Sequence, residues 1–143
     1  MGMDMKRLTT LVTLSILAAL LLSACGAAVT PTAAPITLTD GLSRTVSLAA
    51  PAQKVVSLAP SNTEILFAIG AGGQMVGRDE FSDYPAEAKA LPSVGGSMGT
   101  YSLETIASLK PDLVLAAEIN TPEQVKALED LGLTVYYLSN PKD

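Results

Sequence analysis

The sequence predicts an α/β fold in which a parallel sheet carries helices on both faces and is preceded by a β-hairpin. Short apolar runs rich in β-branched residues, such as Val55–Ala59 and Leu113–Ala117, are typical of buried parallel strands. Stretches with helical spacing and helix start signals follow these runs. The alternation of strand and helix indicates right-handed crossovers. The expected sheet is therefore Rossmann-like.

The hairpin is predicted ahead of the sheet. Residues 36–39 and 44–48 each alternate between apolar and polar side chains, and Asp40-Gly41 between them is a turn signal. Further short strands are expected at residues 75–77, 93–94 and 133–138, with a helical stretch at 86–90.

Capping patterns predict where the helices begin. Ser61 and Glu64 match a capping box, with Ser61 as the N-cap residue, and Thr121 and Gln124 form a second one. Ser102 is placed to cap the helix between them. In the first helix, residues 65, 66, 68 and 69 are expected to form the packed apolar face.

The first 24 residues have the features of a secretory signal peptide. Lys6 and Arg7 form a basic start, and residues 8–22 form an apolar stretch that is too short for a comfortable membrane span. The segment Leu22–Cys25 (LSAC) resembles the bacterial lipobox, in which the cysteine is acylated and becomes the new N-terminus. Cys25 is the only cysteine, so it has no intrachain disulfide partner. An ordinary signal peptide with an incidental cysteine and an uncleaved anchor helix are the alternatives.

We therefore expect three parts. Residues 1–24 are the lipoprotein signal peptide, and residues 25–35 are a tether whose small, uncharged, proline-containing composition is typical of a flexible linker. Residues 36–143 form the folded domain. The acylated Cys25 is expected to anchor this domain to a lipid bilayer outside the cytoplasm, in the periplasm or on the outer face of the cell membrane.

Composition excludes several classes of function. The chain has no His, one Cys and a formal net charge of −5 at pH 7. Without His, neither a Ser-His-Asp nor a Cys-His catalytic site can be built, and the usual zinc ligands are nearly absent. An acidic chain is poorly suited to nucleic-acid phosphates. We expect a binding protein and not an enzyme, with no catalytic residue, no cofactor, no resident metal and no nucleic-acid partner.

Two loops are candidates for a ligand site. In parallel α/β sheets, ligands bind beyond the carboxyl ends of the strands. The loops at residues 78–85 and 95–101 lie at that end and carry Phe81, Tyr84 and Tyr101, half of the aromatic residues in the chain. Such aromatic loops indicate a flat or bulky ligand. The alternative for Tyr84 and Tyr101 is that they fill seams between helices and sheet.

Acidic residues in the first of these loops raise two other hypotheses. Asp79, Glu80 and Asp83 lack the spacing of a cation site, so a solvated loop is the expected environment. An enzyme that uses these carboxylates for acid–base chemistry is a third possibility for the chain. The missing His and the lack of a close carboxylate pair argue against it.

Three ordered segments resemble one known family. They are Val55–Glu64 (VVSLAPSNTE), Phe81–Pro85 (FSDYP) and Ser102–Val114 (SLETIASLKPDLV). They resemble the N-terminal lobe of the helical-backbone substrate-binding proteins, which serve ABC importers for cobalamin, ferric siderophores and haem. The hairpin is similar to the usual opening of this family. The resemblance implies one lobe of a two-lobe binding protein, with a long helix between the lobes and the ligand clasped between them.

The resemblance also implies roles for individual residues. Pro60, Ser61 and Asn62 match the first ligand-facing loop. Phe81 and Tyr84 match the loop that bears aromatic residues.

Three further positions bear on ligand and partner. The most similar cobalamin receptors carry Trp in the third and fourth ligand loops. This chain has Ser97 or Met98 at the third-loop position and Ala117 at the fourth-loop position. It has no Trp at all, which weakens cobalamin as the ligand. Glu104 matches the glutamate that pairs with permease arginines. A carboxylate in a first helical turn is also stabilised by the helix dipole, by about 0.3–1 kcal/mol.

The implied function is that of a substrate-binding lipoprotein. It would capture a metal chelate (a ferric siderophore, haem or cobalamin) and deliver it to a permease and its ATPase without chemistry on the ligand. The family has a second lobe of similar size, so residues 36–143 are expected to be the N-terminal lobe alone and to bind ligand weakly or not at all. The alternative is a truncated single-lobe lipoprotein that acts as an interaction module or is a non-functional relic.

Overall fold

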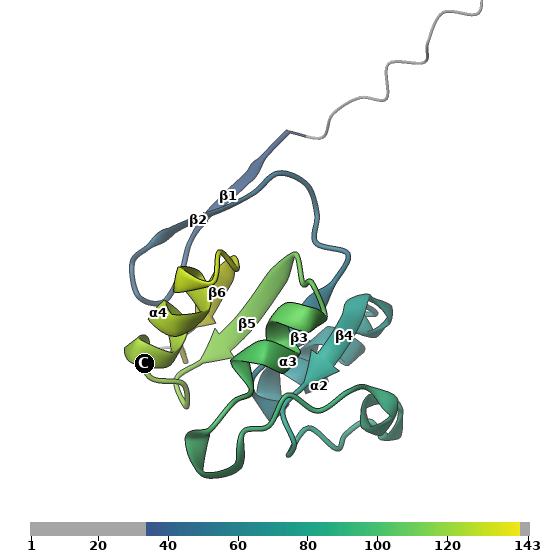
Figure 1. The fold of residues 1–143 in the computed structure, drawn as a ribbon. Coiled ribbons are helices and arrows are strands. Elements are labelled where there is room, and N and C mark those ends of the chain that lie inside the picture. The colour runs from purple at the N-terminus through teal and green to yellow at the C-terminus, as the bar shows by residue number, and fades with distance from the viewer. Residues whose placement is uncertain (1–33, 141–143) are drawn as a thin grey trace, which may run out of the picture. The chain divides into compact units, whose positions relative to one another are not determined.

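The computed structural model describes residues 34–140, so the predicted signal peptide, Cys25 and most of the predicted tether lie outside the described residues. Four parallel strands form the central sheet in the order β4–β3–β5–β6 (Figure 1). Their bounds are Met75–Arg78 for β4, Val55–Ser57 for β3, Leu113–Ala117 for β5 and Val135–Leu138 for β6. The hairpin of β1 (Ile36–Thr39) and β2 (Thr45–Leu48) is antiparallel. The predicted fold class is confirmed.

Helices cover both faces of the sheet. The α-helices are α2 (Pro60–Ala68), α3 (Leu103–Ser108) and α4 (Pro122–Asp130), and the 3-10 helices are η1 (Gly72–Gln74), η2 (Ala86–Ala90) and η3 (Ser97–Gly99). On one face, Ile106 of α3 and Leu128 of α4 pack with Val56 of the sheet. On the other face, Leu66 of α2 packs with Val55. Neighbouring strand residues point to opposite faces, which is why Val55 and Val56 belong to different cores.

The direction of the crossovers decides which helix covers which face. The connection through α2 joins β3 to β4 in one direction across the sheet. The connections through α3 and α4 run in the opposite direction, from β4 to β5 and from β5 to β6. Because such crossovers are right-handed, α2 lies on the opposite face from α3 and α4.

A buried carboxylate ties the hairpin to the sheet. Asp40 is 6% exposed and accepts from the backbone N–H groups of Leu42 (3.0 Å), Arg44 (2.9 Å) and Tyr137 (3.3 Å). The Arg44 guanidinium pairs with Asp40 and, at 2.6 Å, with Glu129 of α4. Burial alone would raise the pKa of Asp40, but the Arg44 side chain and the backbone donors outweigh it and lower that pKa below 3.8.

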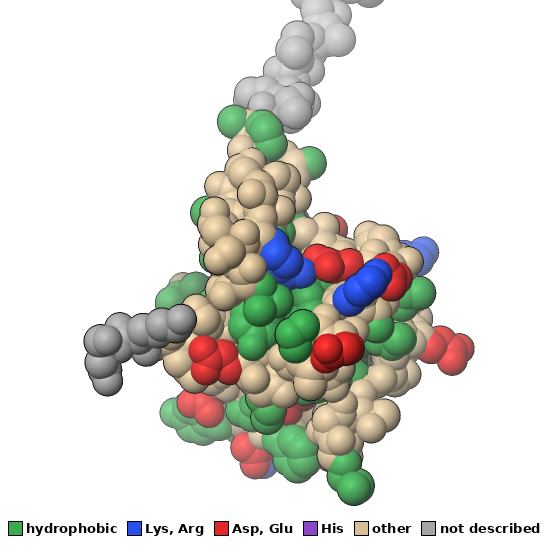
Figure 2. All heavy atoms as spheres, turned by 90° about the vertical axis from the view of Figure 1, so that its left-hand side faces the viewer, with side chains coloured by type: hydrophobic (Ala, Val, Ile, Leu, Met, Phe, Trp, Pro, Cys, Tyr) green, Lys and Arg blue, Asp and Glu red, His purple; other side chains and the backbone are tan. Residues whose placement is uncertain are grey.

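One face of the domain carries neighbouring basic and acidic side chains. Figure 2 shows basic and acidic side chains next to each other there, with apolar side chains between them. Lys126 and Asp130 of α4 form an exposed pair one helical turn apart. Exposed pairs of this kind contribute only about 0.3–0.5 kcal/mol.

Two expectations about the first helix are wrong. Helix α2 begins at Pro60, its N-cap residue is Ala59, and no side chain caps it, so Ser61 is not the cap. The fixed φ of proline suits the first helical position, so the helix begins nearer the N-terminus than predicted. Ile65 and Ile69, expected on a packed face, are 54% and 71% exposed. The caps at Ser102 and Thr121 are confirmed.

A single β-bridge stands in place of one predicted strand. The short strand expected at residues 93–94 is a single bridge between Arg78 and Ser93 at the edge of the sheet. Between residues 34 and 140, no helix is both long and apolar enough to cross a lipid bilayer.

Candidate functional site

Four loops meet beyond the carboxyl ends of the strands. We call them loop A (residues 58–62, after β3, including the first three residues of α2), loop B (79–85, after β4), loop C (95–101, before α3, including η3) and loop D (118–121, after β5). Hydrogen bonds join them in pairs. The Glu80 N–H of loop B donates to the Gly95 carbonyl of loop C at 2.8 Å, and the Tyr101 hydroxyl of loop C donates to the Leu58 carbonyl of loop A at 2.9 Å. This edge is where ligands bind in parallel α/β sheets.

Large apolar side chains project from three of these loops into solvent. Phe81 and Tyr84 of loop B are 59% and 68% exposed, and Met98 of loop C is 99% exposed. Ile119 of loop D is 70% exposed and was missed from the sequence, although its place in a polar turn after a buried strand is a usable signal. We call these four side chains the apolar edge. Exposed apolar groups gathered on the ligand side of a sheet are typical of a binding surface.

The other predicted ligand residues are placed differently. Ser61 and Ser97 are exposed and Pro60 is half-buried, so all three are near the surface of loops A and C. Asn62 is 4% exposed, and its side-chain amide donates to the Leu115 carbonyl of β5 at 3.2 Å. The Asn62 side chain therefore lies over the sheet and away from the apolar edge.

Tyr101 holds three loops together. Its hydroxyl donates to the Leu58 carbonyl and accepts from the Asn120 side-chain amide at 2.8 Å, and the Asn120 carbonyl oxygen accepts from Ala117 N–H at 2.8 Å. Burial raises the pKa of the Tyr101 hydroxyl above 10.0, against a lowering by the Asn120 hydrogen bond. The phenol thus stays protonated and donates at neutral pH. Of the two tyrosines, Tyr101 fills a seam and Tyr84 faces solvent.

The backbone of loop C depends on glycine. Gly95 has φ of 91°, a conformation that L side chains rarely adopt, and a Cβ at this position would lie 2.8 Å from the Thr100 carbonyl oxygen. The tight turn that follows brings Met98 to the surface, itself with φ of 50°. Loop C is therefore set by its glycines and presents one large apolar side chain.

The charges near the apolar edge are mostly acidic. Glu80 and Asp83 are exposed as expected, but Asp79 is 2% exposed, so the prediction of a solvated carboxylate there is wrong. The Arg78 guanidinium donates to the carbonyls of Ala88, Asp79 and Glu80, which occupies it within the protein. Across residues 34–140, no group of three or more His, Cys, Asp and Glu side chains is arranged to hold a metal ion.

Glu104 lies near this edge at the start of α3. It is exposed, one residue after Leu103, and the Ser102 side chain caps the same turn by accepting from Thr105 N–H at 3.1 Å. Glu123 occupies the equivalent position in α4, one residue after Pro122. The two carboxylates therefore share the same local helix environment.

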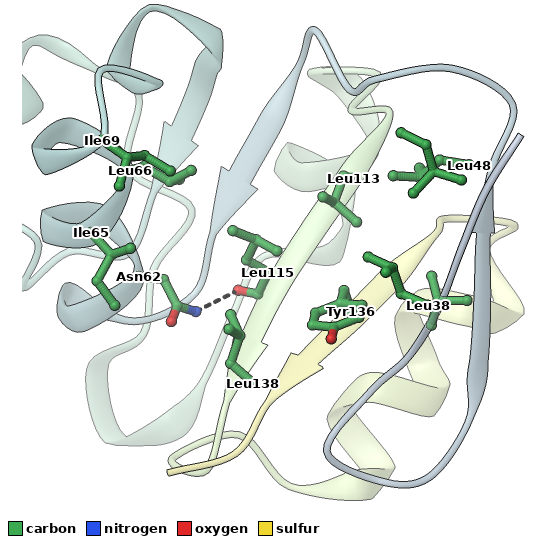
Figure 3. A pocket seen from close by; sticks show the side chains of 12 residues that line it. Leu38, Leu48, Asn62, Ile65, Leu66, Ile69, Leu113, Leu115, Tyr136 and Leu138 are labelled. Atoms are coloured by element: carbon green, nitrogen blue, oxygen red, sulfur yellow. Dashed lines mark hydrogen bonds between the residues drawn. The ribbon is translucent and has the colours of Figure 1, made fainter. Parts of the chain in front are cut away.

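An apolar hollow lies on the face of the sheet that α2 covers. It is an apolar groove of about 250 Å³ above β5 and β6, between α2 and the hairpin (Figure 3). Leu113, Leu115, Tyr136 and Leu138 form its floor, while Leu38, Leu48, Ile65 and Ile69 stand along its sides. It is separate from the apolar edge, and Asn62 lies in it (Figure 3).

Together, the parallel sheet, the joined loops and the apolar edge form the candidate binding site. A family model described as periplasmic binding protein matches residues 55–136, and this chain belongs to that family. The match takes in the three segments that carry the resemblance noted in the sequence.

Individual relatives agree with this assignment. The ABC transporter substrate-binding lipoprotein YvrC of Bacillus subtilis (strain 168) is 40% identical over 104 residues, which are 71% of this chain and 32% of that protein. The structure of the periplasmic vitamin B12 binding protein BtuF of Vibrio cholerae is 42% identical with a TM-score of 0.57, over 61% of this chain and 34% of that one. A periplasmic heme binding protein from Pseudomonas aeruginosa is 34% identical with a TM-score of 0.57, over 64% and 33%. The chain thus spans about a third of these relatives.

Proposed function

We propose that this chain is the N-terminal lobe of a substrate-binding lipoprotein that serves an ABC importer outside the cytoplasm. Its ligand is a metal chelate (a ferric siderophore, haem or cobalamin), which it passes to the permease and its ATPase. The observation that carries the proposal is the apolar edge on the ligand side of the sheet. The names of the relatives support a binding role of this kind.

A titration tests the ligand class. One lobe offers one wall of a two-lobe pocket, so we expect weak binding of cyanocobalamin or haemin, measured by visible absorbance. Phe81→Ser should weaken it further, because exposed aromatic area is lost. Leu131→Ser is the matched control, since Leu131 is also exposed, at 52%, but ends α4 at the other edge of the sheet. Nanomolar binding would contradict the single-lobe assignment, and equal loss in both variants would contradict the apolar edge.

The apolar groove supports the assignment of residues 36–143 as one lobe of a larger protein. Parallel sheets occur with both faces covered, yet the crossovers place α3 and α4 on one face and leave β5 and β6 open on the other. The relatives are about three times as long as the matched region. We assign the groove to an apolar helix from the remaining part of the complete receptor.

Exposure of the groove can be measured. A dye such as ANS, which fluoresces on apolar surfaces, should bind this chain and bind a complete receptor much less. Ile69→Lys should reduce dye binding by this chain with little change in stability, because Ile69 is 71% exposed. Equal dye binding by the chain and the complete receptor would contradict the assignment and would favour the single-lobe interaction module.

Glu104 is proposed as the contact to the permease. Glu104→Arg in the complete receptor should lower co-purification with the permease–ATPase complex and leave ligand affinity unchanged. Glu123→Arg is the matched control, because it disturbs the same position of a capped helix. If both variants lower co-purification equally, or if Glu104→Arg abolishes ligand binding, the docking role is refuted.

The membrane anchor is proposed at Cys25. Cys25→Ser should move the protein from the membrane fraction to the soluble fraction and remove the lipid mass from the N-terminal peptide in mass spectrometry. An unchanged membrane fraction would favour an uncleaved anchor helix.

A further inference from the structure

A chain of buried hydroxyl groups runs beneath loop B. The Ser57 hydroxyl, at the end of β3, donates to the Ala59 carbonyl at 2.9 Å, and the Thr63 hydroxyl, in the first turn of α2, donates to Ser57 Oγ at 2.9 Å. Thr63 Oγ1 also lies 2.8 Å from Ser82 Oγ of loop B, so its single hydroxyl hydrogen is shared between the Ser57 and Ser82 oxygens. Ser82 in turn donates to the Asp79 carboxylate. These hydrogen-bonded side chains therefore connect β3, α2 and loop B.

All four members of this chain are removed from solvent. Ser57 and Thr63 are 0% exposed, Ser82 is 1% exposed and Asp79 is 2% exposed. Burying polar groups is unfavourable unless they are hydrogen-bonded, and a satisfied network selects one arrangement over others. Among the described residues, no buried side-chain nitrogen or oxygen lacks a partner. Each side chain of the network thus has a hydrogen-bond partner, and these contacts are specific for the observed position of loop B.

Asp79 also fixes the backbone that carries the aromatic residues. Its second carboxylate oxygen accepts from Phe81 N–H at 2.9 Å. The Arg78 guanidinium holds the Asp79 and Glu80 carbonyls at 2.8 and 3.1 Å. The Asp79 and Arg78 side chains thus hydrogen-bond to the backbone of loop B, while Phe81 stays 59% exposed.

We propose that Thr63 and Asp79 are positioning residues of the ligand face. Through Ser82 they lock loop B to the start of α2, so that loops A and B form one rigid surface. A surface ordered in advance loses less conformational freedom when ligand binds, which strengthens binding. The inference rests on the proposed function, because it assigns loop B its task, but its first test needs no ligand.

Amide hydrogen exchange, followed by NMR on the purified protein, tests the lock. Thr63→Val keeps the shape of the side chain and removes its hydroxyl. The amides of Glu80 and Phe81 should then exchange about tenfold faster or more, the effect of losing about one buried hydrogen bond, while the amides of Val56 and Val114 change less than about twofold. Thr63→Ser should restore slow exchange. Thr45→Val, at an exposed position of β2, is the control and should change neither set.

A second variant protects the test against loss of folding. Ser82→Ala breaks the chain on the loop side and leaves α2 intact, and it should give the same local acceleration. Equal acceleration of loop and core amides in both variants would mean that the network only stabilises the domain, and would overturn the inference.

Ligand probes separate this inference from the proposed function. Cyanocobalamin and haemin, titrated at millimolar concentration, should shift the loop B signals of the unmodified protein, and Thr63→Val should weaken that binding by about tenfold, with recovery in Thr63→Ser. Loop B signals that no probe shifts would refute the proposed function while the exchange result still decides the lock. Binding that Thr63→Val leaves unchanged would refute the positioning role.

Discussion

Replacing Asp40 by Asn should destabilise the domain by about 2–3 kcal/mol. Asn keeps one acceptor oxygen, which can still serve the N–H groups of Leu42 and Arg44. Its NH₂ group, however, replaces the carboxylate oxygen that the Arg44 guanidinium and Tyr137 N–H contact. Breaking a fully buried pair costs about 3–5 kcal/mol. We expect a smaller cost than this for Asp40→Asn, because the Arg44 side chain is 27% exposed and keeps its ion pair with Glu129.

Urea unfolding followed by circular dichroism measures this change. We expect a lower midpoint with an unchanged slope, because the exposed surface of the unfolded chain is the same. The matched control is Asp130→Asn, which breaks a pair whose side chains are 71% and 62% exposed and should cost less than about 0.5 kcal/mol.

The pH dependence gives an independent check. The pKa of Asp40 is lowered in the folded protein, so the ionised form stabilises the fold above pH 3.8, and this contribution is lost as the pH falls through the folded-state pKa. The difference between the unmodified protein and Asp40→Asn should therefore shrink as the pH falls below about 4. A difference below about 0.5 kcal/mol at neutral pH, or one that does not shrink, would refute the buried-pair reasoning.

Three further predictions concern the loops and caps. Gly95→Ala should destabilise the domain by about 1–3 kcal/mol and lower its melting temperature by several degrees, because Gly95 has a positive φ and lies close to the Thr100 carbonyl. Gly73→Ala is the control and should have no such effect, since nothing lies within 4 Å of the added Cβ. Equal effects of the two substitutions would contradict backbone strain at Gly95. Thr121→Ala should cost about 1 kcal/mol in urea unfolding by removing the capping box, and Thr121→Ser should restore most of it; an unchanged midpoint in Thr121→Ala would contradict the cap. The raised pKa of Tyr101 means that stability is fully present below pH 10 and is lost above it, as the pH rises through the folded-state pKa. Tyr101→Phe should flatten this alkaline decline, measured by urea unfolding.

Local patterns sufficed for much of the fold. The strand at Leu113–Ala117 has the bounds that its apolar run predicts, and the hairpin lies within one residue of its prediction. The capping box at Thr121 is present as predicted. These features depend on residues a few positions apart, so their chemistry is visible in the sequence.

The first helix shows where local patterns were insufficient. Both Ser61 and Pro60 are start signals, and the structure uses Pro60 with an uncapped Ala59 before it. Ile65 and Leu66 have similar hydrophobicity, yet only Leu66 packs against the sheet. Which residue is buried depends on how the helix is rotated about its axis by the right-handed crossover.

The sequence by itself determined the class of fold and predicted the sheet edge and the aromatic residues of the candidate site, because these follow from periodicity, turn chemistry and three ordered motifs. Only the tertiary structure decided that the Tyr101 hydroxyl hydrogen-bonds loop A, whereas Tyr84 is exposed and belongs to the apolar edge. It alone placed Asp79 in a hydroxyl network with Thr63, and Ile119 at the apolar edge. The reason is physical: burial and hydrogen-bond partners are set by segments distant in the chain, which meet only when the sheet has formed.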